Sequence, residues 1–340
     1  MRRLRVLHVT HPDCLPPETD EGYSYKEIMR WKTDFDVVKA LRELGHEVRS
    51  LGVDDELRPV RDMLDDYEPH IVFNLLEQFA GLPEMDQHVV SYLELRRVAY
   101  TGCNPRGLTL ARDKSLAKKL VHYHRILTPA FLVFPRRRKV RIPAKLGYPA
   151  IVKSATEEAS MGISQASVVE DEASLVERIG FIHDQIGTDA MVEEYIDGRE
   201  LYVGVLGNQR KTVLPVWELG FGKLGKGASA PIATEKVKHD ATYQKKMGIT
   251  HGVAKNLPEG VEELAVRTVK RICRILEVDG YARIDFRMTA DGRLYFLEAN
   301  PNPEVAWEEE LAASAELAGI EYPDLIRRIV NFGLARKRLI

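Results

Sequence analysis

The chain has 340 residues, a formal net charge of −2 and three widely spaced cysteines. This length allows two or three structural units with buried cores. The charge leaves no global basic footprint for nucleic acid, and the cysteines form neither a disulfide framework nor a zinc pattern. The basic run at 136–139 stands between prolines and is typical of a solvated loop.

No apolar run approaches the ~20 residues that a membrane helix needs, and the apolar part of the N-terminal segment is too short for a signal peptide. An odd number of scattered cysteines favours a reducing compartment. We therefore expect a cytoplasmic protein without membrane contact.

The first hundred residues alternate between short apolar runs and helical patterns. We expect strands at 4–9, 46–51, 71–74 and 98–101, and helices at 34–44, 58–67 and 85–95. This order predicts an α/β domain with a parallel sheet and right-handed crossovers, which we assign to residues 1–104. The polar insertion 12–31, which contains Trp31, is expected to be an exposed loop, with a substrate lid as the alternative.

The remaining chain predicts two α+β units, 105–196 and 197–340. In the first, we expect a helix capped by Asp113, strands at 131–134, 150–153, 164–169 and 191–195, and a helix at 171–186. In the second, we expect two strands after residue 200, a helix at 261–278, a hairpin at 281–300, and helices at 308–318 and 324–334.

The hairpin contains an alternating strand, Tyr281–Met288, followed by a turn. Asp-Gly at 291–292 favours a two-residue type I′ loop, in which residues 290 and 293 pair. That register sets Asp285 opposite Glu298.

Opposed carboxylates destabilise a strand pair unless a cation lies between them. Asn300 shares a face with Glu298 and adds an oxygen ligand suited to Mg²⁺. The segment therefore predicts a magnesium site that includes Asp285. The alternative is a solvent-facing hairpin whose charges never meet.

Lys153 ends an apolar strand, and small residues follow it up to Gly162. The backbone N–H groups of such a loop can approach phosphates while the lysine supplies a point charge. An ordinary loop with a solvent-reaching lysine explains the pattern equally well.

The strand at 191–195 carries Glu193 and Glu194, and Glu200 follows a turn. These carboxylates could accept hydrogen bonds from adenine and ribose, although surface charge alone explains them. Gly220–Gly225 matches GxGxxG but opens no helix, so we expect a mobile lid there and no dinucleotide site.

Together and in this order, these segments resemble the ATP-grasp superfamily, specifically its D-alanine–D-alanine ligase branch. The resemblance is strong from about Asp113 onward, and only the α/β pattern agrees before it. It implies that the two later units are ATP-grasp subdomains that bind ATP between them, with Mg²⁺ or Mn²⁺. It also implies a homodimer.

The resemblance implies roles for the matching residues. Phosphate contacts fall to Lys114 and Lys153, the closing phosphate loop to Glu157, Ser160 and Gly162, the adenine strand to Glu193, Glu194 and Ile196, and the ribose to Glu200. Lys236 fits a further phosphate lysine, with Lys238 as the register alternative. Asp285, Glu298 and Asn300 match the magnesium ligands, and Arg283 matches the cation that faces the reacting acyl group.

The implied reaction joins a small-molecule carboxylate to an amine through an acyl phosphate, with release of ADP and phosphate. One alternative passes the acyl phosphate to a thiol or another nucleophile. Another is a nucleotide-binding regulator without catalysis, against which the presence of Lys153, Arg283 and Asp285 argues.

The substrate side departs from the D-alanine enzymes. Ala159 and Glu304 stand where they carry serine and glycine, and Glu309 falls near the serine that reads the second substrate's carboxylate. A carboxylate there would repel an amino-acid carboxylate and favour a cation. We therefore expect an amine substrate other than D-alanine that carries positive charge. Glu77, after a strand of the first domain, is either substrate-facing or a helix-start charge.

Overall fold

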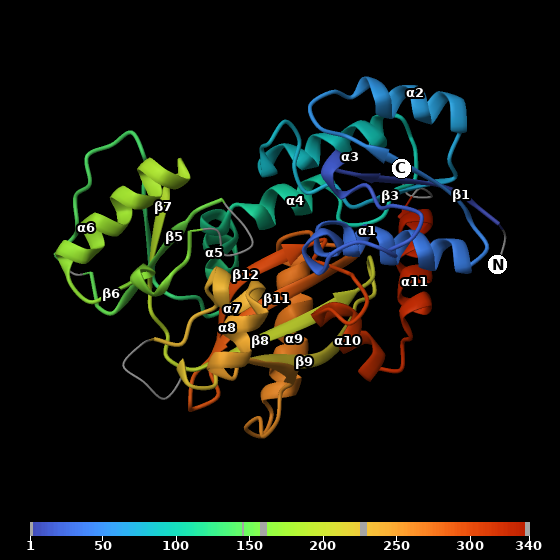
Figure 1. Ribbon diagram of the computed structural model, residues 1–340. Helices are drawn as coiled ribbons and strands as arrows, with labels where there is room; N and C mark the ends of the chain where they lie inside the picture. The colour runs from blue at the N-terminus through green and yellow to red at the C-terminus, as the bar shows by residue number, and fades with distance from the viewer. Residues whose placement is uncertain (1–2, 145, 157–161, 225–229, 337–340) are drawn as a thin grey trace.

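The computed structural model describes residues 3–144, 146–156, 162–224 and 230–336. Its strands form three sheets with the orders β2-β1-β3, β4-β7-β5-β6 and β10-β9-β8-β11-β12. In Figure 1 the four-stranded sheet occupies a lobe of its own on the left, and the five-stranded sheet lies below the N-terminal sheet. No helix in these ranges is both long and apolar enough to cross a membrane.

The N-terminal sheet is parallel, as predicted. Strand β1 (Arg5–Thr10) lies between β2 (Glu47–Gly52) and β3 (Ile71–Asn74). Alternate residues of β1 and β3 enter two cores. One core is shared with α2 (Arg58–Tyr67) and α3 (Asp86–Leu95), and the other with α1 (Tyr25–Glu43) and the C-terminal helix. Burial on both faces explains why these strands are continuously apolar.

Two predictions for this domain are wrong. Helix α1 runs over Tyr25–Glu43, so the second half of the expected exposed loop is helical. Ser24 starts the helix because its hydroxyl accepts from the Glu27 N–H while the Glu27 carboxylate accepts from the Ser24 N–H. The strand expected at 98–101 is only a bridge between Val72 and Tyr100.

The central unit has its own core, built from apolar residues such as Val152, Ile179 and Val192. That core contains residues of β4 (Phe131–Phe134), β5 (Ala150–Ser154), β6 (Val168–Val169), α6 (Glu172–Phe181) and β7 (Ala190–Glu194). Helices α4 (Pro105–Arg112) and α5 (Lys114–Tyr123) instead pack in the core shared by the N-terminal and C-terminal sheets, through residues such as Leu108 and Val121. Asp113 caps α5 as predicted, accepting from the Leu116 N–H at 2.9 Å.

Two elements of this unit are shorter than predicted. A 3-10 turn replaces most of the strand expected at 164–169, since the Ser167 hydroxyl accepts from the Ser164 N–H. The helix expected at 171–186 becomes a π-helical turn after Phe181.

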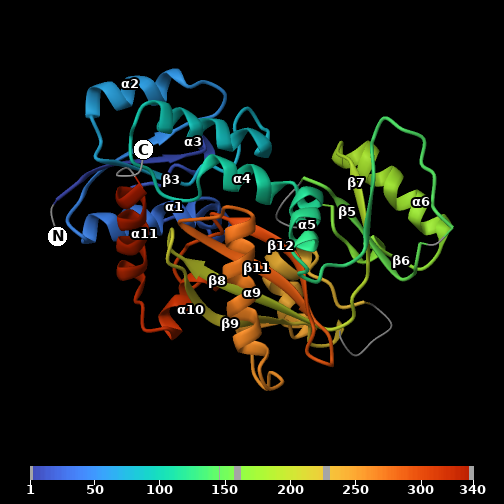
Figure 2. The same cartoon turned by 180° about the vertical axis from the view of Figure 1, so that it is seen from behind.

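The C-terminal unit is built on an antiparallel sheet of β8 (Arg199–Leu206), β9 (Thr212–Gly220), β10 (Thr250–Val253), β11 (Tyr281–Met288) and β12 (Leu294–Pro301). Helix α9 (Val261–Ile275) covers one face, as Figure 2 shows, because its Val269 and Ile272 pack with Ile284 and Phe296. Short helices α7 (Glu235–His239) and α8 (Ala241–Met247) precede β10.

The end of the chain returns to the N-terminal sheet. Helix α10 (Glu310–Leu317) leads into α11 (Tyr322–Arg336), whose Ile326 and Ile329 share a core with Ile71 and Phe73 of β3. The sheets lie in residues 5–74, 131–194 and 199–301. The domain boundaries near 104 and 196 stay predictions, because α11 belongs to the N-terminal core.

Candidate functional site

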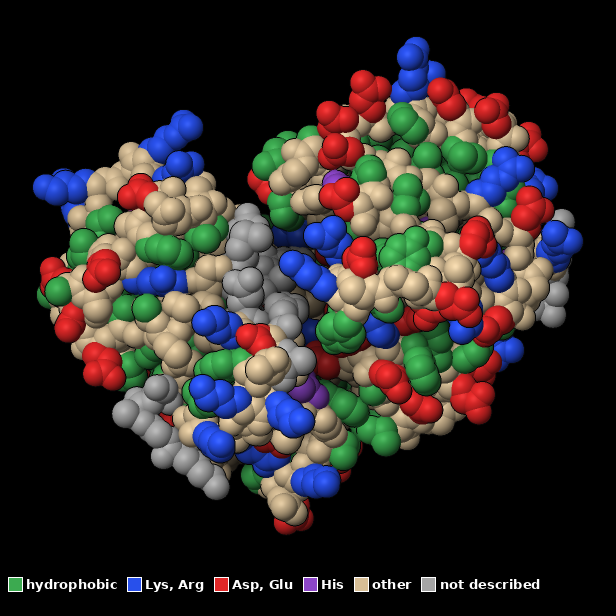
Figure 3. Space-filling view, viewed as in Figure 1, with side chains coloured by type: hydrophobic (Ala, Val, Ile, Leu, Met, Phe, Trp, Pro, Cys, Tyr) green, Lys and Arg blue, Asp and Glu red, His purple; other side chains and the backbone are tan. Residues whose placement is uncertain are grey.

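A cavity of about 840 Å³ lies between the four-stranded and five-stranded sheets. Six apolar side chains form much of its wall: Pro129, Ile151, Ile163, Ile196, Ile232 and Leu297. In Figure 3 the outline of the molecule is notched between the lobe that carries α6 and the rest. A cavity that combines apolar walls with charged groups suits a ligand that joins a flat ring to an anion.

Asp285 and Glu298 lie opposite each other on β11 and β12, as predicted, and both line the cavity. The Arg283 guanidinium donates two hydrogen bonds to Asp285, one to each carboxylate oxygen, at 2.8 and 2.9 Å. Burial and Glu298 raise the pKa of Asp285 to about 6 despite the nearby arginine. This carboxyl is therefore held where a further cation would stabilise its charge.

The turn between these strands differs from the predicted one. Three residues form the loop, and the last of them, Gly292, has φ +81°. A three-residue loop shifts the pairing by one position relative to a two-residue turn. Leu297, an unpaired residue beside Glu298, forms a bulge that restores the register. The predicted pairing is confirmed although the predicted turn is wrong.

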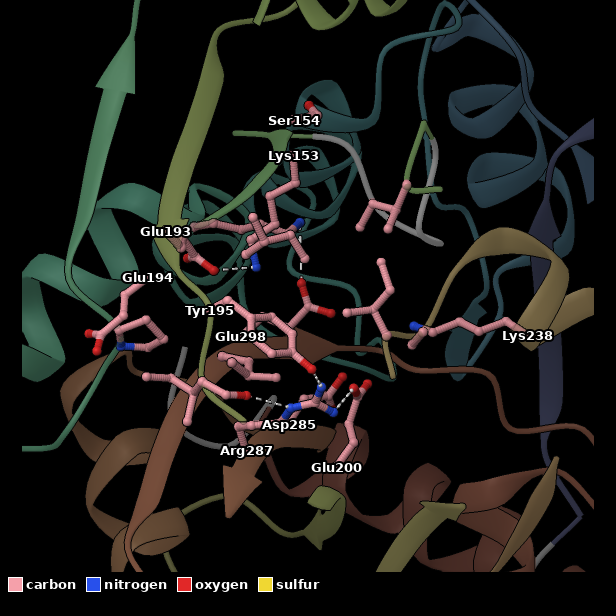
Figure 4. A pocket seen from close by; sticks show the side chains of 18 residues that line it. Lys153, Ser154, Glu193, Glu194, Tyr195, Glu200, Lys238, Asp285, Arg287 and Glu298 are labelled. Carbon is pink, nitrogen blue, oxygen red and sulfur yellow. Dashed lines mark hydrogen bonds and ion pairs between the residues drawn. The ribbon is translucent and has the colours of Figure 1, made fainter. Parts of the chain in front are cut away.

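Lysines surround Glu298. The Lys114 ammonium lies 3.4 Å from its carboxylate, and Lys153 and Lys238 line the same cavity. Burial raises the pKa of Glu298, but Lys114, Lys238 and Lys153 together hold it well below its usual range. Figure 4 shows Lys238 reaching toward Glu298 from the side opposite Glu193. This concentration of positive charge suits phosphate oxygens.

The structure distinguishes Lys238 from Lys236. Lys236 is exposed on α7 and is not among the residues that line the cavity. Lys238 follows two residues later and faces the site. The geometry therefore favours Lys238, the alternative that the resemblance left open, over Lys236.

Glu193 lies in the cavity wall, but its carboxylate is held between two lysines. It contacts Lys118 at 2.9 Å and Lys153 at 2.6 Å, and it is 1% exposed. Burial raises the pKa of Glu193, but both lysines hold it below its usual value. Burial lowers the pKa of Lys118 to about 8 despite Glu193. These contacts fix the position of Lys153.

Glu200 also lines the cavity, and it has two strong partners. Arg287 donates to one carboxylate oxygen at 2.9 Å, and the Tyr202 hydroxyl donates to the other at 2.8 Å. Sequence reasoning missed Arg287, although it shares a strand face with Arg283 and Asp285. It likewise missed Lys118, one helical turn after Lys114.

Arg283 has a second carboxylate partner that the sequence did not single out. Its Nη1 donates to Glu310 at 2.9 Å, and the other Glu310 oxygen lies 3.2 Å from His251 Nδ1. The guanidinium also stacks over the ring of Tyr202, 4.6 Å from its centroid. Burial lowers the pKa of Arg283, but Asp285 and Glu310 raise it well above its usual value.

The segment after Asn300 contacts helix α1. The Thr33 hydroxyl donates to Glu304 at 3.1 Å, and the Trp307 N–H donates to Asp36 at 3.0 Å. The Lys32 ammonium donates to the Trp307 carbonyl. Residues far apart in the sequence thus meet here, although the residues named in these contacts are not among those that line the cavity.

Glu309 caps α10 beside this segment and is half-buried. Burial, together with Glu304, raises its pKa to about 7. The charges of Lys32 and His251 oppose this shift without cancelling it. The segment that leads into α10 is therefore acidic.

The other predicted residues are placed as follows. Ile196 and Glu194 line the cavity. Gly162 has φ +71°, and a Cβ there would meet Ile186 at 2.8 Å. Glu157 and Ser160 lie outside the described residues. Glu77 is exposed after β3 and close enough to raise the pKa of the buried Tyr281.

The oxygen donors of the hairpin fit a magnesium ion. Asp285, Glu298 and Asn300 supply carboxylate and amide oxygens, which are the ligands that Mg²⁺ prefers. The Asn300 amide nitrogen donates to the Asp285 carboxylate at 3.0 Å, so the Asn300 side chain lies beside Asp285. A set with only two carboxylates leaves coordination positions for water and phosphate oxygens.

Sequence comparison identifies the family. Residues 119–331 match the family described as D-ala D-ala ligase C-terminus. The D-alanine–D-alanine ligase of Aquifex aeolicus is 30% identical over 319 residues, covering 91% of this chain and 97% of that protein. An uncharacterised protein of Sinorhizobium fredii is 32% identical over 300 residues, covering 87% and 85%.

Solved structures share the fold. The D-alanine–D-alanine ligase from Bacillus anthracis complexed with ATP matches with a TM-score of 0.74 and 20% identity over 99% of both chains. The VanG D-Ala:D-Ser ligase from Enterococcus faecalis matches with a TM-score of 0.71 and 18% identity over 98% of this chain and 100% of that chain. Enzymes of this family use ATP and Mg²⁺. The chain belongs to the D-alanine–D-alanine ligase family of ATP-grasp proteins.

Proposed function

We propose that this protein is an ATP-dependent ligase that joins a carboxylate to an amine through an acyl phosphate. The observation that carries this proposal is the opposed pair of the buried Asp285 and the half-buried Glu298, with Lys114, Lys153 and Lys238 lining the same cavity. Two carboxylates beside three lysines can hold metal-bound phosphates from several sides. Membership of a family of ATP-dependent ligases supports the same reaction class.

In the first step a substrate carboxylate attacks the γ-phosphate of ATP. Catalysis of such a transfer is mainly positioning and charge neutralisation. Lys114, Lys153 and Lys238 supply the fixed positive charges. Mg²⁺ bound by Asp285, Glu298 and Asn300 would neutralise further phosphate charge.

In the second step the amine attacks the acyl carbon and phosphate leaves. Arg283 would stabilise the oxyanion of the tetrahedral intermediate. Asp285 and Glu310 hold its guanidinium from two sides, at 2.8 to 2.9 Å, so its direction is set before substrate arrives. Neither step needs a covalent nucleophile from the protein.

For the acceptor, we propose an amine that carries a second positive charge. Glu304 and Glu309 influence each other electrostatically, and Glu310 lies beside them at the start of α10. An acceptor with a carboxylate would add a further negative charge to this end of the site. An acceptor with a cationic group would instead relieve the repulsion between these side chains.

The test is ADP release by the purified protein with ATP and Mg²⁺ across a grid of carboxylates and amines. Release that requires both substrates, with diamines or basic amino acids as the best acceptors, supports the proposal. Efficient turnover with D-alanine alone contradicts the acceptor assignment. Release with thiols in place of amines indicates the other nucleophile class, and ATP binding without turnover across the grid indicates a regulator.

A variant sharpens the acceptor test. Glu309→Ser removes the carboxylate, so we expect kcat/KM for the cationic acceptor to fall about tenfold and that for simple amino acids to rise. Glu308→Ser is the matched control, because Glu308 is the exposed neighbour in the same turn. Equal effects of both changes would remove Glu309 from acceptor recognition.

A further inference from the structure

Arg287 is a buried arginine in the wall of the nucleotide cavity, and none of the steps above uses it. It lies on β11 two residues beyond Asp285, lines the cavity and is 3% exposed. A buried guanidinium has to be paired and hydrogen-bonded to offset the cost of its desolvation. The hydrogen-bond partners of Arg287 therefore indicate which groups its guanidinium positions.

Those partners come from three segments. Arg287 donates to the Glu200 carboxylate at 2.9 Å, to the Ile196 carbonyl at 3.1 Å and to the Tyr195 hydroxyl at 3.3 Å. It also donates to the carbonyl of Pro231. In Figure 4 these contacts lie at the end of the cavity away from Lys153. The guanidinium thus ties β11 to β8, to the linker between β7 and β8, and to the segment before α7.

Glu200 is fixed from two directions. One oxygen accepts from Arg287 and the other from the Tyr202 hydroxyl, and each carboxylate oxygen has a further lone pair for a ligand. The carboxylate is consequently oriented before a nucleotide binds. A preorganised acceptor discriminates more sharply for a hydroxyl than a free side chain does.

We propose that Arg287 is a positioning residue that sets the enzyme's selectivity for the ribose hydroxyls of its nucleotide, by holding Glu200 and the linker at residues 195–196. This inference rests on the proposed nucleotide site. It assigns the phosphates to the lysines. It assigns the ribose to Glu200, which Arg287 and Tyr202 orient within the described part of the chain. Loss of Arg287 should therefore reduce the preference for ATP over deoxynucleotides more than it reduces the rate of the reaction.

The experiment measures equilibrium binding of ATP, 2′-deoxy-ATP and 3′-deoxy-ATP with Mg²⁺ and no other substrate. For the unchanged protein, we expect at least one deoxynucleotide to bind about tenfold more weakly than ATP, as befits a hydrogen bond to a charged group. In Arg287→Met that ratio should fall below about threefold.

Arg199→Met is the matched control. Arg199 also pairs with a glutamate of the same sheet, Glu218, and with two backbone carbonyls, but neither Arg199 nor Glu218 lines the cavity. It should leave the ratio unchanged. If Arg287→Met does not fold, Tyr202→Phe tests the same point, because it removes the hydroxyl that holds Glu200 and keeps the ring under Arg283.

Each outcome has one meaning. A ratio unchanged in Arg287→Met and in Tyr202→Phe overturns the proposal, and so does equal binding of all three nucleotides by the unchanged protein. Failure to bind ATP at all would instead contradict the proposed function. A reduced ratio that appears equally in Arg199→Met would mean a general loosening of the sheet, which also overturns the role of Arg287.

Discussion

Asp285 and Glu298 are opposed across β11 and β12, so two carboxylates that repel each other are held together at the cavity wall. If Mg²⁺ binds between them, Asp285→Asn should lower kcat by at least about 100-fold and weaken Mg²⁺-dependent ATP binding. A magnesium titration of ATP binding measures this effect. Asp291→Asn, on the exposed turn of the same hairpin, should change neither value. An unchanged magnesium dependence in Asp285→Asn would remove the pair from metal binding.

Lys238 and Lys236 provide a comparison within one short helix. Lys238→Met removes a charge that acts on both Asp285 and Glu298, and we expect kcat/KM for ATP to fall by about tenfold or more. Lys236→Met removes an exposed charge and should change it less than twofold. Steady-state kinetics with ATP as the varied substrate measure both. The opposite order would restore Lys236 as the phosphate lysine.

Glu193 should matter first for stability. Glu193→Gln leaves the buried ammonium groups of Lys118 and Lys153 without their shared counter-charge, so the free energy of unfolding should fall by about 3 kcal/mol. Denaturant unfolding measures the difference. Glu194→Gln changes the exposed neighbour and should stay within about 0.5 kcal/mol. ATP binding to a folded Glu193→Gln protein should also weaken, because Lys153 loses its anchor.

Glu309 predicts a pH dependence of stability. The folded chain keeps the Glu309 proton up to about pH 7, whereas the ordinary pKa of this group is 4.5. The folded state is therefore progressively penalised as the pH rises from about 4.5 to 7, through the charge that burial and Glu304 disfavour. Glu309→Gln escapes this penalty.

Relative to the unchanged protein, Glu309→Gln should gain about 1 kcal/mol more at pH 8 than at pH 5, after allowance for partial exposure. Denaturant unfolding at both pH values measures this gain. Lys32 on α1, His251 on β10 and the neighbouring Glu310 also act on this carboxyl. A stability difference that does not vary with pH would show that Glu309 is ionised throughout.

The sequence predicted the pairing of Asp285 with Glu298 and the cap at Asp113 because both signals are local. The strand alternation around Asp285 and the cap at Asp113 depend on residues a few positions apart, and both were confirmed. The hairpin shows the limit of this reasoning. The Asp-Gly turn suggested a loop of two residues, but the loop has three. The bulge at Leu297 restores the expected pairing, and no sequence pattern indicated that bulge.

Contacts between distant segments were not predictable in the same way. The ion pair of Arg283 with Glu310, and that of Arg287 with Glu200, depend on how separate elements meet in the fold. The start of α1 was missed for a different reason. Ser24 and Glu27 match the capping-box pattern in the sequence. The first buried apolar residue of the helix is Trp31, so the apolar pattern does not mark the first turns as helical.

Helix α1 reaches from the first domain to the segment that follows Asn300, where Thr33 binds Glu304. The groups proposed to hold phosphates all lie elsewhere, on α5, β5, α7 and the hairpin. If Glu304 and Glu309 recognise the acceptor as proposed, substitutions in these two separate stretches would change acceptor choice while the lysines and carboxylates around the nucleotide stay the same. Under that assignment, α1 and the 304–309 segment are the natural targets for changing the acceptor.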